Sequence, residues 1–180
     1  MTAAVFLDRD GTLNARPPAH QYIGSVDEFV WLPGAREGLA RLSGAGYLLA
    51  VASNQRGVAR GIVPAGVLPE LEERIQRDLA AYGCRIEAFR YCVHDLDDGC
   101  ACRKPAPGLI LGLAAELGVR LSESWMIGDS ESDVLAGKAA GCRTVLLAPA
   151  NSGSQADVVA SSLLSAAAIV AGPRASTSAA

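Results

Sequence analysis

Two aspartates separated by one residue, Asp8 and Asp10, follow a short apolar run and lead into a Gly-Thr pair. A hard cation with oxygen ligands would relieve the repulsion between two carboxyl groups in one loop. Asp129 and Asp133 offer further oxygens. Mg²⁺ suits such a site, because it binds one or two carboxylates together with a substrate phosphate. Taken alone, the Asp-x-Asp-Gly-Thr segment is equally compatible with an Asx turn that ends a strand.

A second group of residues has the composition of a zinc site. It comprises Cys92, His94, Cys100 and Cys102, immediately before Arg103 and Lys104. Three thiolates and one imidazole form a closed tetrahedral Zn²⁺ site with Zn–S distances near ~2.3 Å, which is a structural type of site. Buried packing of these cysteines is the alternative, but the residues at 95–99 are polar and typical of a loop. Zinc would brace Arg103 and Lys104 against a phosphate.

The elements that must position these groups alternate along the chain. Short apolar runs predict strands at Ala3–Leu7, Tyr47–Ala52, Phe89–Val93, Ser124–Ile127 and Thr144–Leu147. Helical spacing predicts a first helix that is opened by Pro33-Gly34-Ala35 and ends at Gly44-Ala45-Gly46. Further helices are predicted at Pro69–Tyr82, Pro107–Leu117 and Val134–Ala140, with a last short strand and helix within Asp157–Val170. This alternation indicates a doubly wound α/β fold with a mainly parallel sheet.

Polar groups follow three of the predicted strands. Asp8 and Asp10 follow the first, Ser53-Asn54 the second, and Gly128-Asp129 a later one. Ligands of a parallel α/β sheet bind beyond the carboxyl ends of its strands, so these groups are expected to converge. Hydrolysis of a phosphate ester requires a nucleophile, an acid for the leaving oxygen and positive charge for the phosphoryl group. The chain contains all three.

The bulk properties favour one domain that acts on a small molecule. The chain has 180 residues, 19% of them charged, and a net charge of -3, so it lacks the basic field of a nucleic-acid-binding protein. We expect a single domain at 1–171 and a disordered tail at 172–180, which is rich in Ser, Thr, Ala, Pro and Gly. No signal peptide or membrane span is recognisable, which favours a cytoplasmic protein with no membrane partner, and we expect a monomer.

Four ordered motifs resemble the haloacid dehalogenase superfamily. They are Phe6-Leu7-Asp8-Arg9-Asp10-Gly11-Thr12-Leu13-Asn14, Ser53-Asn54-Gln55, Arg103-Lys104-Pro105, and Gly128-Asp129-Ser130-Glu131-Ser132-Asp133. The resemblance covers residues 4 to about 148. It implies a Rossmann-like phosphatase fold, and the short insertions between the motifs leave no room for a large cap domain.

The resemblance also implies roles for the motif residues. Asp8 would be the nucleophile that forms an aspartyl-phosphate, and Asp10 would protonate the leaving oxygen and then activate water. Ser53 and Lys104 would hold the phosphoryl group. Asp8, the backbone carbonyl of Asp10, and Asp129 would bind Mg²⁺, with Asp133 outside the direct ligand set. A carboxyl group outside full metal contact can hold a proton for donation, which agrees with the role of Asp10.

The cysteine-rich segment resembles the zinc-loop branch of the superfamily, which includes phosphatases of a heptose 1,7-bisphosphate and of histidinol phosphate. Under that resemblance Arg103 recognises the substrate, and the pocket is lined by the loop around Tyr22 and by Ser53, Asn54, Gln55 and Arg56. The heptose substrate at its C7 phosphate is favoured. Two features depart from that pattern: Arg16-Pro17-Pro18, which resembles the histidinol-phosphatases, and Ser130, where lysine is frequent.

Three further assignments complete the sequence-based picture. A zinc-stapled binding module without turnover is the competing function, and the four intact residues Asp8, Asp10, Lys104 and Asp129 argue against it. His20 lies in the long loop after the first strand, where a solvated surface position is favoured over a substrate contact. The remaining aromatic and thiol side chains of note are expected to pack in the core: Trp31, Trp125, Cys84 and Cys142.

Overall fold

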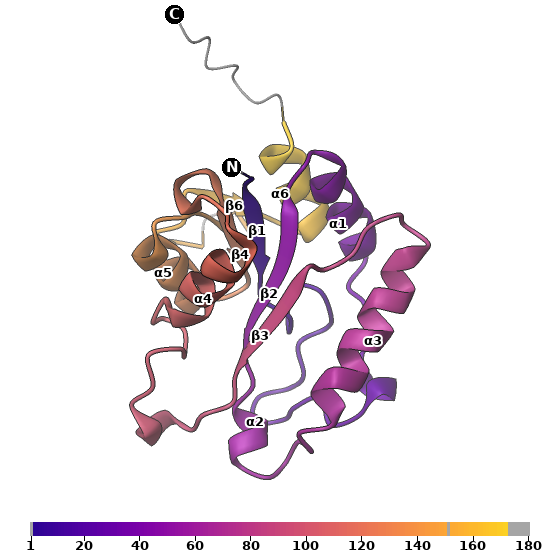
Figure 1. Cartoon of the computed structure of the whole chain (residues 1–180), viewed down its shortest axis with the longest axis vertical. Coiled ribbons are helices and arrows are strands. Elements are labelled where there is room, and N and C mark those ends of the chain that lie inside the picture. The colour runs from indigo at the N-terminus through magenta and orange to yellow at the C-terminus, as the bar shows by residue number, and fades with distance from the viewer. Residues whose placement is uncertain (1, 151, 173–180) are drawn as a thin grey trace, which may run out of the picture.

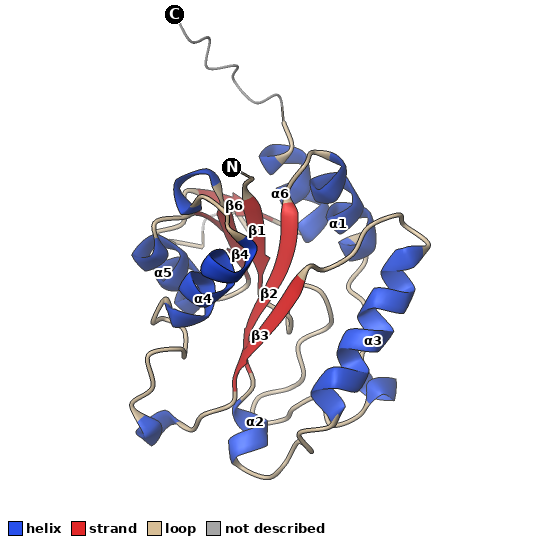
Figure 2. Cartoon of the chain, in the orientation of Figure 1, coloured by secondary structure: helices blue, strands red, loops and turns tan. Residues whose placement is uncertain are grey.

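A six-stranded, wholly parallel sheet forms the centre of the molecule (Figures 1 and 2). The computed structural model describes residues 2–150 and 152–172. The strand order is β3-β2-β1-β4-β5-β6. The strands are β1 (Ala4–Leu7), β2 (Leu48–Asn54), β3 (Ala88–Cys92), β4 (Trp125–Gly128), β5 (Arg143–Leu147) and β6 (Val158–Ala160). This arrangement confirms the predicted doubly wound α/β class.

Helices cover both faces of the sheet, as Figure 1 shows. One face packs against α1 (Ala35–Gly44), α3 (Val67–Ala80) and α6 (Leu163–Val170). The other packs against α4 (Gly108–Leu117) and α5 (Glu131–Ala140). The shorter helical segments are α2 (Arg56–Ala59) and three 3₁₀ turns, η1 (Val26–Glu28), η2 (Leu96–Asp98) and η3 (Leu121–Glu123).

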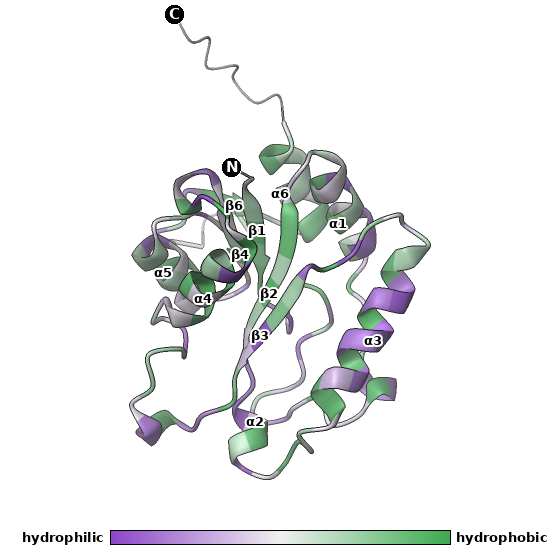
Figure 3. Ribbon diagram, viewed as in Figure 1, coloured by the Kyte–Doolittle hydropathy of each residue, from purple (hydrophilic) through white to green (hydrophobic). Residues whose placement is uncertain are grey.

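The hydropathy of the strands explains why both faces are covered. Alternate residues of β1 enter different cores: Val5 and Leu7 contact the first helix layer, whereas Ala4 and Phe6 contact the second. Apolar residues on both sides of a strand require helices on both sides. Figure 3 shows the consequence, with hydrophobic strands at the centre and a helix α3 that is hydrophilic on its outer side.

Most predicted elements are present, with small shifts of their ends. Helix α3 begins at Val67 instead of Pro69, α5 begins at Glu131 instead of Val134, and β2 continues through Asn54. The short helix α2 was not predicted. Of the predicted tail, 173–180 lies outside the described residues. Among the residues described, no helix combines the length and the apolar character that a membrane span requires.

The strand order reverses direction between β1 and β4. The chain proceeds from β1 to β2 and β3 on one side, and from β4 to β5 and β6 on the other. Loops that leave β1 and β4 therefore diverge and open a crevice at the carboxyl edge of the sheet. Asp8 follows β1 and Asp129 follows β4. Their parallel pairing, Leu7 beside Ile127, brings the two aspartates to the same crevice.

Candidate active site

A buried lysine joins two aspartates at the floor of the crevice. Lys104 Nζ lies 2.8 Å from Asp8 Oδ1 and 2.6 Å from Asp133 Oδ1. All three residues are at most 8% exposed. Burial raises the pKa of Asp8, Lys104 opposes that rise, and Asp133 adds to it. The paired carboxylates raise the pKa of Lys104 against the effect of burial, so the ammonium stays charged. The predicted nucleophile and the predicted phosphate-binding cation thus lie in direct contact.

Asp129 completes a group of carboxylates suited to a hard cation. Carboxylate oxygens of Asp8, Asp129 and Asp133 lie within 4.8 Å of one another. Burial raises the pKa of Asp129 to about 6, with Asp8 and Asp133 adding to the rise and Arg16 opposing it. A divalent cation bound to oxygen ligands would neutralise this group, so the donor set fits Mg²⁺.

Gly11 makes the approach of Asp129 possible. Its φ of +88° is in the left-handed region, and a Cβ at this position would lie 1.8 Å from Asp129 Oδ2. Any side chain here would strain the backbone and displace the carboxylate. The absence of a side chain at the glycine of the Asp-x-Asp-Gly-Thr segment therefore leaves room for the Asp129 carboxylate in the candidate metal site.

Asp10 is held by four hydrogen-bond donors. Its Oδ1 accepts from Arg9 Nε at 3.1 Å and Asn14 Nδ2 at 3.0 Å. Its Oδ2 accepts from Arg9 Nη2 at 3.0 Å and Gln55 Nε2 at 2.9 Å. Burial alone would raise the pKa of Asp10, but the charge of Arg9 and these hydrogen bonds lower it below the ordinary value. These contacts thus favour the ionised form of Asp10 in the substrate-free protein.

Arg9 belongs to the candidate site, although it was not predicted from the sequence. Its side chain is fully buried, and its Nη2 also donates to Gln55 Oε1 at 3.0 Å. Arginine is almost never fully buried unless it is paired. The signal was its place between two aspartates, directly after a strand whose residues are all buried. Gln55 was predicted to line the substrate pocket, but it is 2% exposed and its amide contacts Arg9, Asp10 and Ser53.

Asn54 positions the lysine. Its Nδ2 donates to the backbone oxygen of Lys104, and its Oδ1 accepts from the backbone N–H of Lys104, each at 3.1 Å. This pair of bonds joins the end of β2 to the loop that follows β3. Ser53, at the same strand end, is buried, and its hydrogen bond to the Asp8 carboxylate helps to lower the pKa of that group against burial. Two predicted pocket residues thus contact Lys104 and Asp8.

A pocket of about 340 Å³ opens above these groups. Its walls include the predicted residues Asp8, Asp10, Tyr22, Ser53, Asn54 and Lys104, and also His20, Arg16, Pro17, Pro18, Ser130, Ser132 and Asp133. His20 is exposed, as expected, yet it faces this pocket. Arg56 and Arg103, which were predicted to contact the substrate, are not among the described residues that line this pocket. Arg56 is paired with Asp95, and Arg103 is half-buried with no hydrogen-bond partner for its Nη1 among the described residues.

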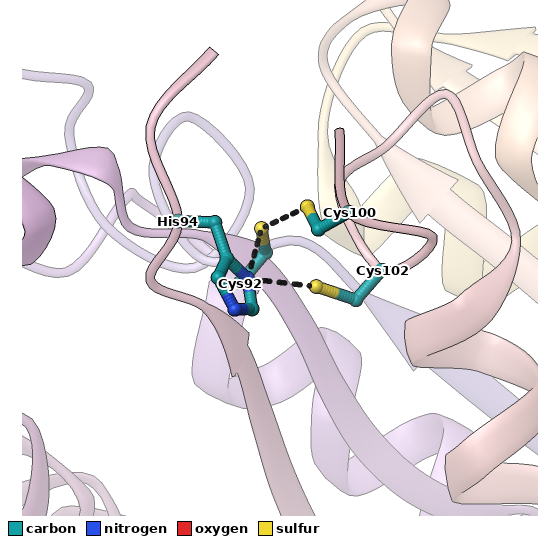
Figure 4. Close-up of side chains that lie close together, drawn as sticks. All are labelled: Cys92, His94, Cys100 and Cys102. Carbon is teal, nitrogen blue, oxygen red and sulfur yellow. Dashed lines mark hydrogen bonds between the residues drawn. The ribbon is translucent and has the colours of Figure 1, made fainter. Parts of the chain in front are cut away.

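The four predicted zinc ligands lie together, as Figure 4 shows. Cys92 Sγ is 3.6 Å from Cys100 Sγ and 3.7 Å from His94 Nδ1, which is 3.2 Å from Cys102 Sγ. All four ligand atoms lie within 4.8 Å of one another. Three sulfurs and one nitrogen around a common centre fit the donor set of a structural Zn²⁺ site.

The thiols of this cluster shift one another's pKa. Burial raises the pKa of Cys102, and the neighbouring thiols raise it further, to about 12. Burial also acts to raise the pKa of Cys100, but hydrogen bonds lower it to about 7, the largest of them from the backbone N–H of Arg103. That contact ties the cysteine cluster to the segment that carries Lys104. The cluster is therefore placed to fix the position of Lys104.

The remaining packing assignments hold. Trp125, Cys84 and Cys142 are buried. Trp31 packs edge-on against Phe29 and donates its indole N–H to Asp78 at 2.8 Å. These side chains belong to the core, away from the pocket.

Comparison with known proteins places this geometry in a family. A family model for HAD-hydrolase-like proteins matches residues 101–166. The D-glycero-beta-D-manno-heptose-1,7-bisphosphate 7-phosphatase of Pseudomonas aeruginosa is 41% identical over 143 residues, which cover 79% of each chain. The chain belongs to the haloacid dehalogenase superfamily. Within that superfamily it is a member of this phosphatase family.

Two further relatives extend the similarity beyond the motifs. The phosphatase of the same name from Haemophilus ducreyi is 34% identical and is matched over 94% of its length, by 89% of this chain. The crystal structure of D,D-heptose 1,7-bisphosphate phosphatase from B. bronchiseptica, complexed with magnesium and phosphate, superposes with a TM-score of 0.82 at 33% identity. That alignment covers 94% of this chain and 98% of the B. bronchiseptica chain. The chain is thus a phosphatase of phosphate monoesters.

Proposed function

We propose that the protein removes the C7 phosphate of D-glycero-D-manno-heptose 1,7-bisphosphate through an aspartyl-phosphate of Asp8. One observation carries the proposal: Asp8 contacts Lys104 in a buried site, and Asp129 lies beside them at the carboxyl edge of the sheet. The named relatives, 34–41% identical, support the heptose substrate. The pocket of about 340 Å³ suits a sugar phosphate in size and polarity.

In the first half-reaction, a carboxylate oxygen of Asp8 attacks phosphorus and the bond from phosphorus to the C7 oxygen breaks. Lys104 and Ser53 hold the transferring phosphoryl group, and Asp10 gives a proton to the departing sugar oxygen. Lys104 supplies positive charge that is already in place, so it stabilises the developing charge without reorganisation. Two hydrogen bonds from Asn54 hold the backbone of Lys104 beside Asp8.

In the second half-reaction, a water molecule attacks the aspartyl-phosphate and inorganic phosphate leaves. Asp10 removes a proton from that water. Its lowered pKa leaves it ionised and ready to accept the proton. All four of its acceptor positions are occupied, so one donor must release it before it can react.

Two metals complete the proposal. Mg²⁺ would be held by Asp8, Asp129 and the backbone carbonyl of Asp10, where it would offset the negative charge of carboxylates and phosphate. Asp133 would stay outside this set, because it pairs with Lys104 and caps helix α5. Zn²⁺ would be held by Cys92, His94, Cys100 and Cys102 as a structural ion. The cytoplasmic location and the monomeric state remain predictions.

The experiment is a comparison of kcat/KM for the heptose 1,7-bisphosphate and histidinol phosphate, with purified protein and Mg²⁺. Histidinol phosphate is the second candidate, because the prolines of Arg16-Pro17-Pro18 line the pocket. The ratio of the two constants measures discrimination in the transition state. A ratio well above one supports the heptose, and a ratio below one replaces it with histidinol phosphate.

A zinc-stapled binding module without turnover is the competing class of function. The variant Asp8→Asn removes the nucleophile and keeps its size. It should bind the substrate and form no phosphoenzyme, whereas the wild type should be labelled transiently. Hydrolysis by Asp8→Asn at the wild-type rate would exclude Asp8 as the nucleophile. Absence of hydrolysis of every phosphate ester by the wild type would favour the binding module.

A further inference from the structure

Arg16 binds a residue of the metal site. Its Nη2 lies 2.5 Å from Asp129 Oδ1, on a carboxylate that the cation would also use. The Asp129 side chain is 14% exposed, whereas that of Arg16 is 54% exposed and lines the pocket. A divalent cation on the same carboxylate would repel the guanidinium, because both carry positive charge. The exposed side chain of Arg16 is free to take a second position when the cation binds.

The loop that carries Arg16 has a fixed backbone on both sides of this residue. On one side, the Ala15 N–H donates to the backbone oxygen of Val30 at 2.8 Å. On the other, Pro18–Gln21 forms a turn closed by a 3.0 Å bond, with His20 at a φ of 66°. A non-glycine residue persists in the left-handed region only when its surroundings hold it there. The backbone is thus anchored, and the long side chain of Arg16 is the part that can swing.

The charges of the pocket indicate where the side chain goes. Among the described residues that line it, Lys104 and Arg16 are the arginine or lysine side chains. Lys104 is engaged by Asp8 and Asp133 beneath the phosphate that is cleaved. A sugar bisphosphate carries a second phosphate, with about -1.5 to -2 charges near neutral pH. Arg16 is the lining cation left for it, and guanidinium binds phosphate by two parallel hydrogen bonds.

We propose that Arg16 is a specificity residue, which leaves Asp129 when Mg²⁺ binds and then holds the phosphate of the substrate that is not cleaved. This inference rests on the proposed function, because it assigns a role within the same pocket. It makes metal binding and recognition of the second phosphate cooperative through one side chain.

The first test compares kcat/KM for the heptose 1,7-bisphosphate and the heptose 7-phosphate, which lacks the second phosphate. In Arg16→Ala the ratio of these constants should fall by about tenfold or more, mainly through KM for the bisphosphate. Arg16→Lys should recover part of the loss. Arg85→Ala is the matched control, because Arg85 is exposed and pairs with Glu87 away from the pocket, and its ratio should equal that of the wild type.

A second test measures Mg²⁺ affinity and does not depend on catalytic turnover. Titration calorimetry of Mg²⁺ into substrate-free protein should give a lower Kd for Arg16→Ala than for the wild type, by about two- to fivefold, because the competing guanidinium is gone. An equal or higher Kd would overturn the displacement from Asp129. An unchanged substrate ratio in Arg16→Ala, with an active wild type, would overturn the role in specificity. Inactivity of the wild type on both sugars refutes the proposed function instead, and the calorimetric result stands apart from it.

Discussion

The buried pair of Arg9 and Asp10 offers a sharp test of how the site is held together. The variant Arg9→Met keeps a long side chain and removes the charge and three hydrogen bonds, two to Asp10 and one to Gln55. Asp10 then stays as a largely buried carboxylate without its cation. Breaking a buried ion pair by removing one partner costs about 3–5 kcal/mol. For a chain of this size that corresponds to a fall in Tm of roughly 6–20 °C.

The assay is urea unfolding of the wild type, Arg9→Met, Asp10→Asn and the double variant. In the double variant no charge is left unpaired, so its stability should exceed that of Arg9→Met by about 1 kcal/mol or more. A free energy of unfolding for Arg9→Met within about 1 kcal/mol of the wild type would refute the reasoning. So would strict additivity of the two substitutions.

The same variant should change how stability depends on pH. The pKa of Asp10 is lowered in the folded protein, so its pairing stabilises the fold above the pKa of the unfolded chain. That contribution disappears as the pH falls through the folded pKa and the carboxylate gains a proton. Arg9→Met lacks the contribution at every pH. The stability difference between the wild type and Arg9→Met should therefore be largest near neutral pH and shrink in acid.

Three further predictions concern the metals. Cys100→Ser should lose bound zinc and have a lower Tm, and a chelator should have the same effect, since structural zinc contributes of order 10 kcal/mol. Cys84→Ala, a control outside the cluster, should keep its zinc. Equal zinc contents in the two variants would contradict the zinc site. The pKa of Asp129 is about 6, so protons should compete with Mg²⁺ for this carboxylate. Binding of Mg²⁺ to the metal-free protein should weaken about tenfold between pH 7 and pH 5. A Kd that stays constant over this range would argue against proton competition at Asp129. Gly11→Ala should weaken Mg²⁺ binding about 10–100-fold in the same titration, because its Cβ would displace Asp129; wild-type affinity would show that the carboxylate adapts.

The positions of the strands and of the main site residues could be predicted from the sequence because the signals are local. Apolar runs such as Ala4–Leu7 can be buried on both faces only as central strands. Parallel strands then carry whatever follows them to one edge, which is how Asp8 and Asp129 meet although they are far apart in the sequence. The four predicted zinc ligands follow the same logic, since Cys92 ends β3 and the other three lie in the loop that follows it.

The directions of side chains in the loops could not be predicted, because they depend on contacts between segments that are distant in the chain. Asn54 and Gln55 both follow Ser53, yet the amide of Asn54 bonds the backbone of Lys104 and that of Gln55 bonds Asp10. Arg16 reaches Asp129 across 113 positions of sequence. The resemblance assigned residues to the substrate site but not their orientations, and the contacts of Gln55 and Arg56 in the structure depend on segments distant in the sequence.

The hydrogen bonds of Asp10 determine which protonation state this residue favours in the proposed reaction. An acid that donates a proton to the sugar oxygen must first hold one, and the lowered pKa of Asp10 opposes this in the substrate-free protein. Substrate binding changes the balance, because a phosphate dianion beside Asp8 adds negative charge and raises the pKa of a neighbouring carboxyl group. After the sugar has left, the same residue must be ionised, which Arg9 and Gln55 favour. Arg9 therefore stabilises the ionised form of Asp10, which the second half-reaction needs. The charge of the bound substrate must favour the protonated form, which the first half-reaction needs.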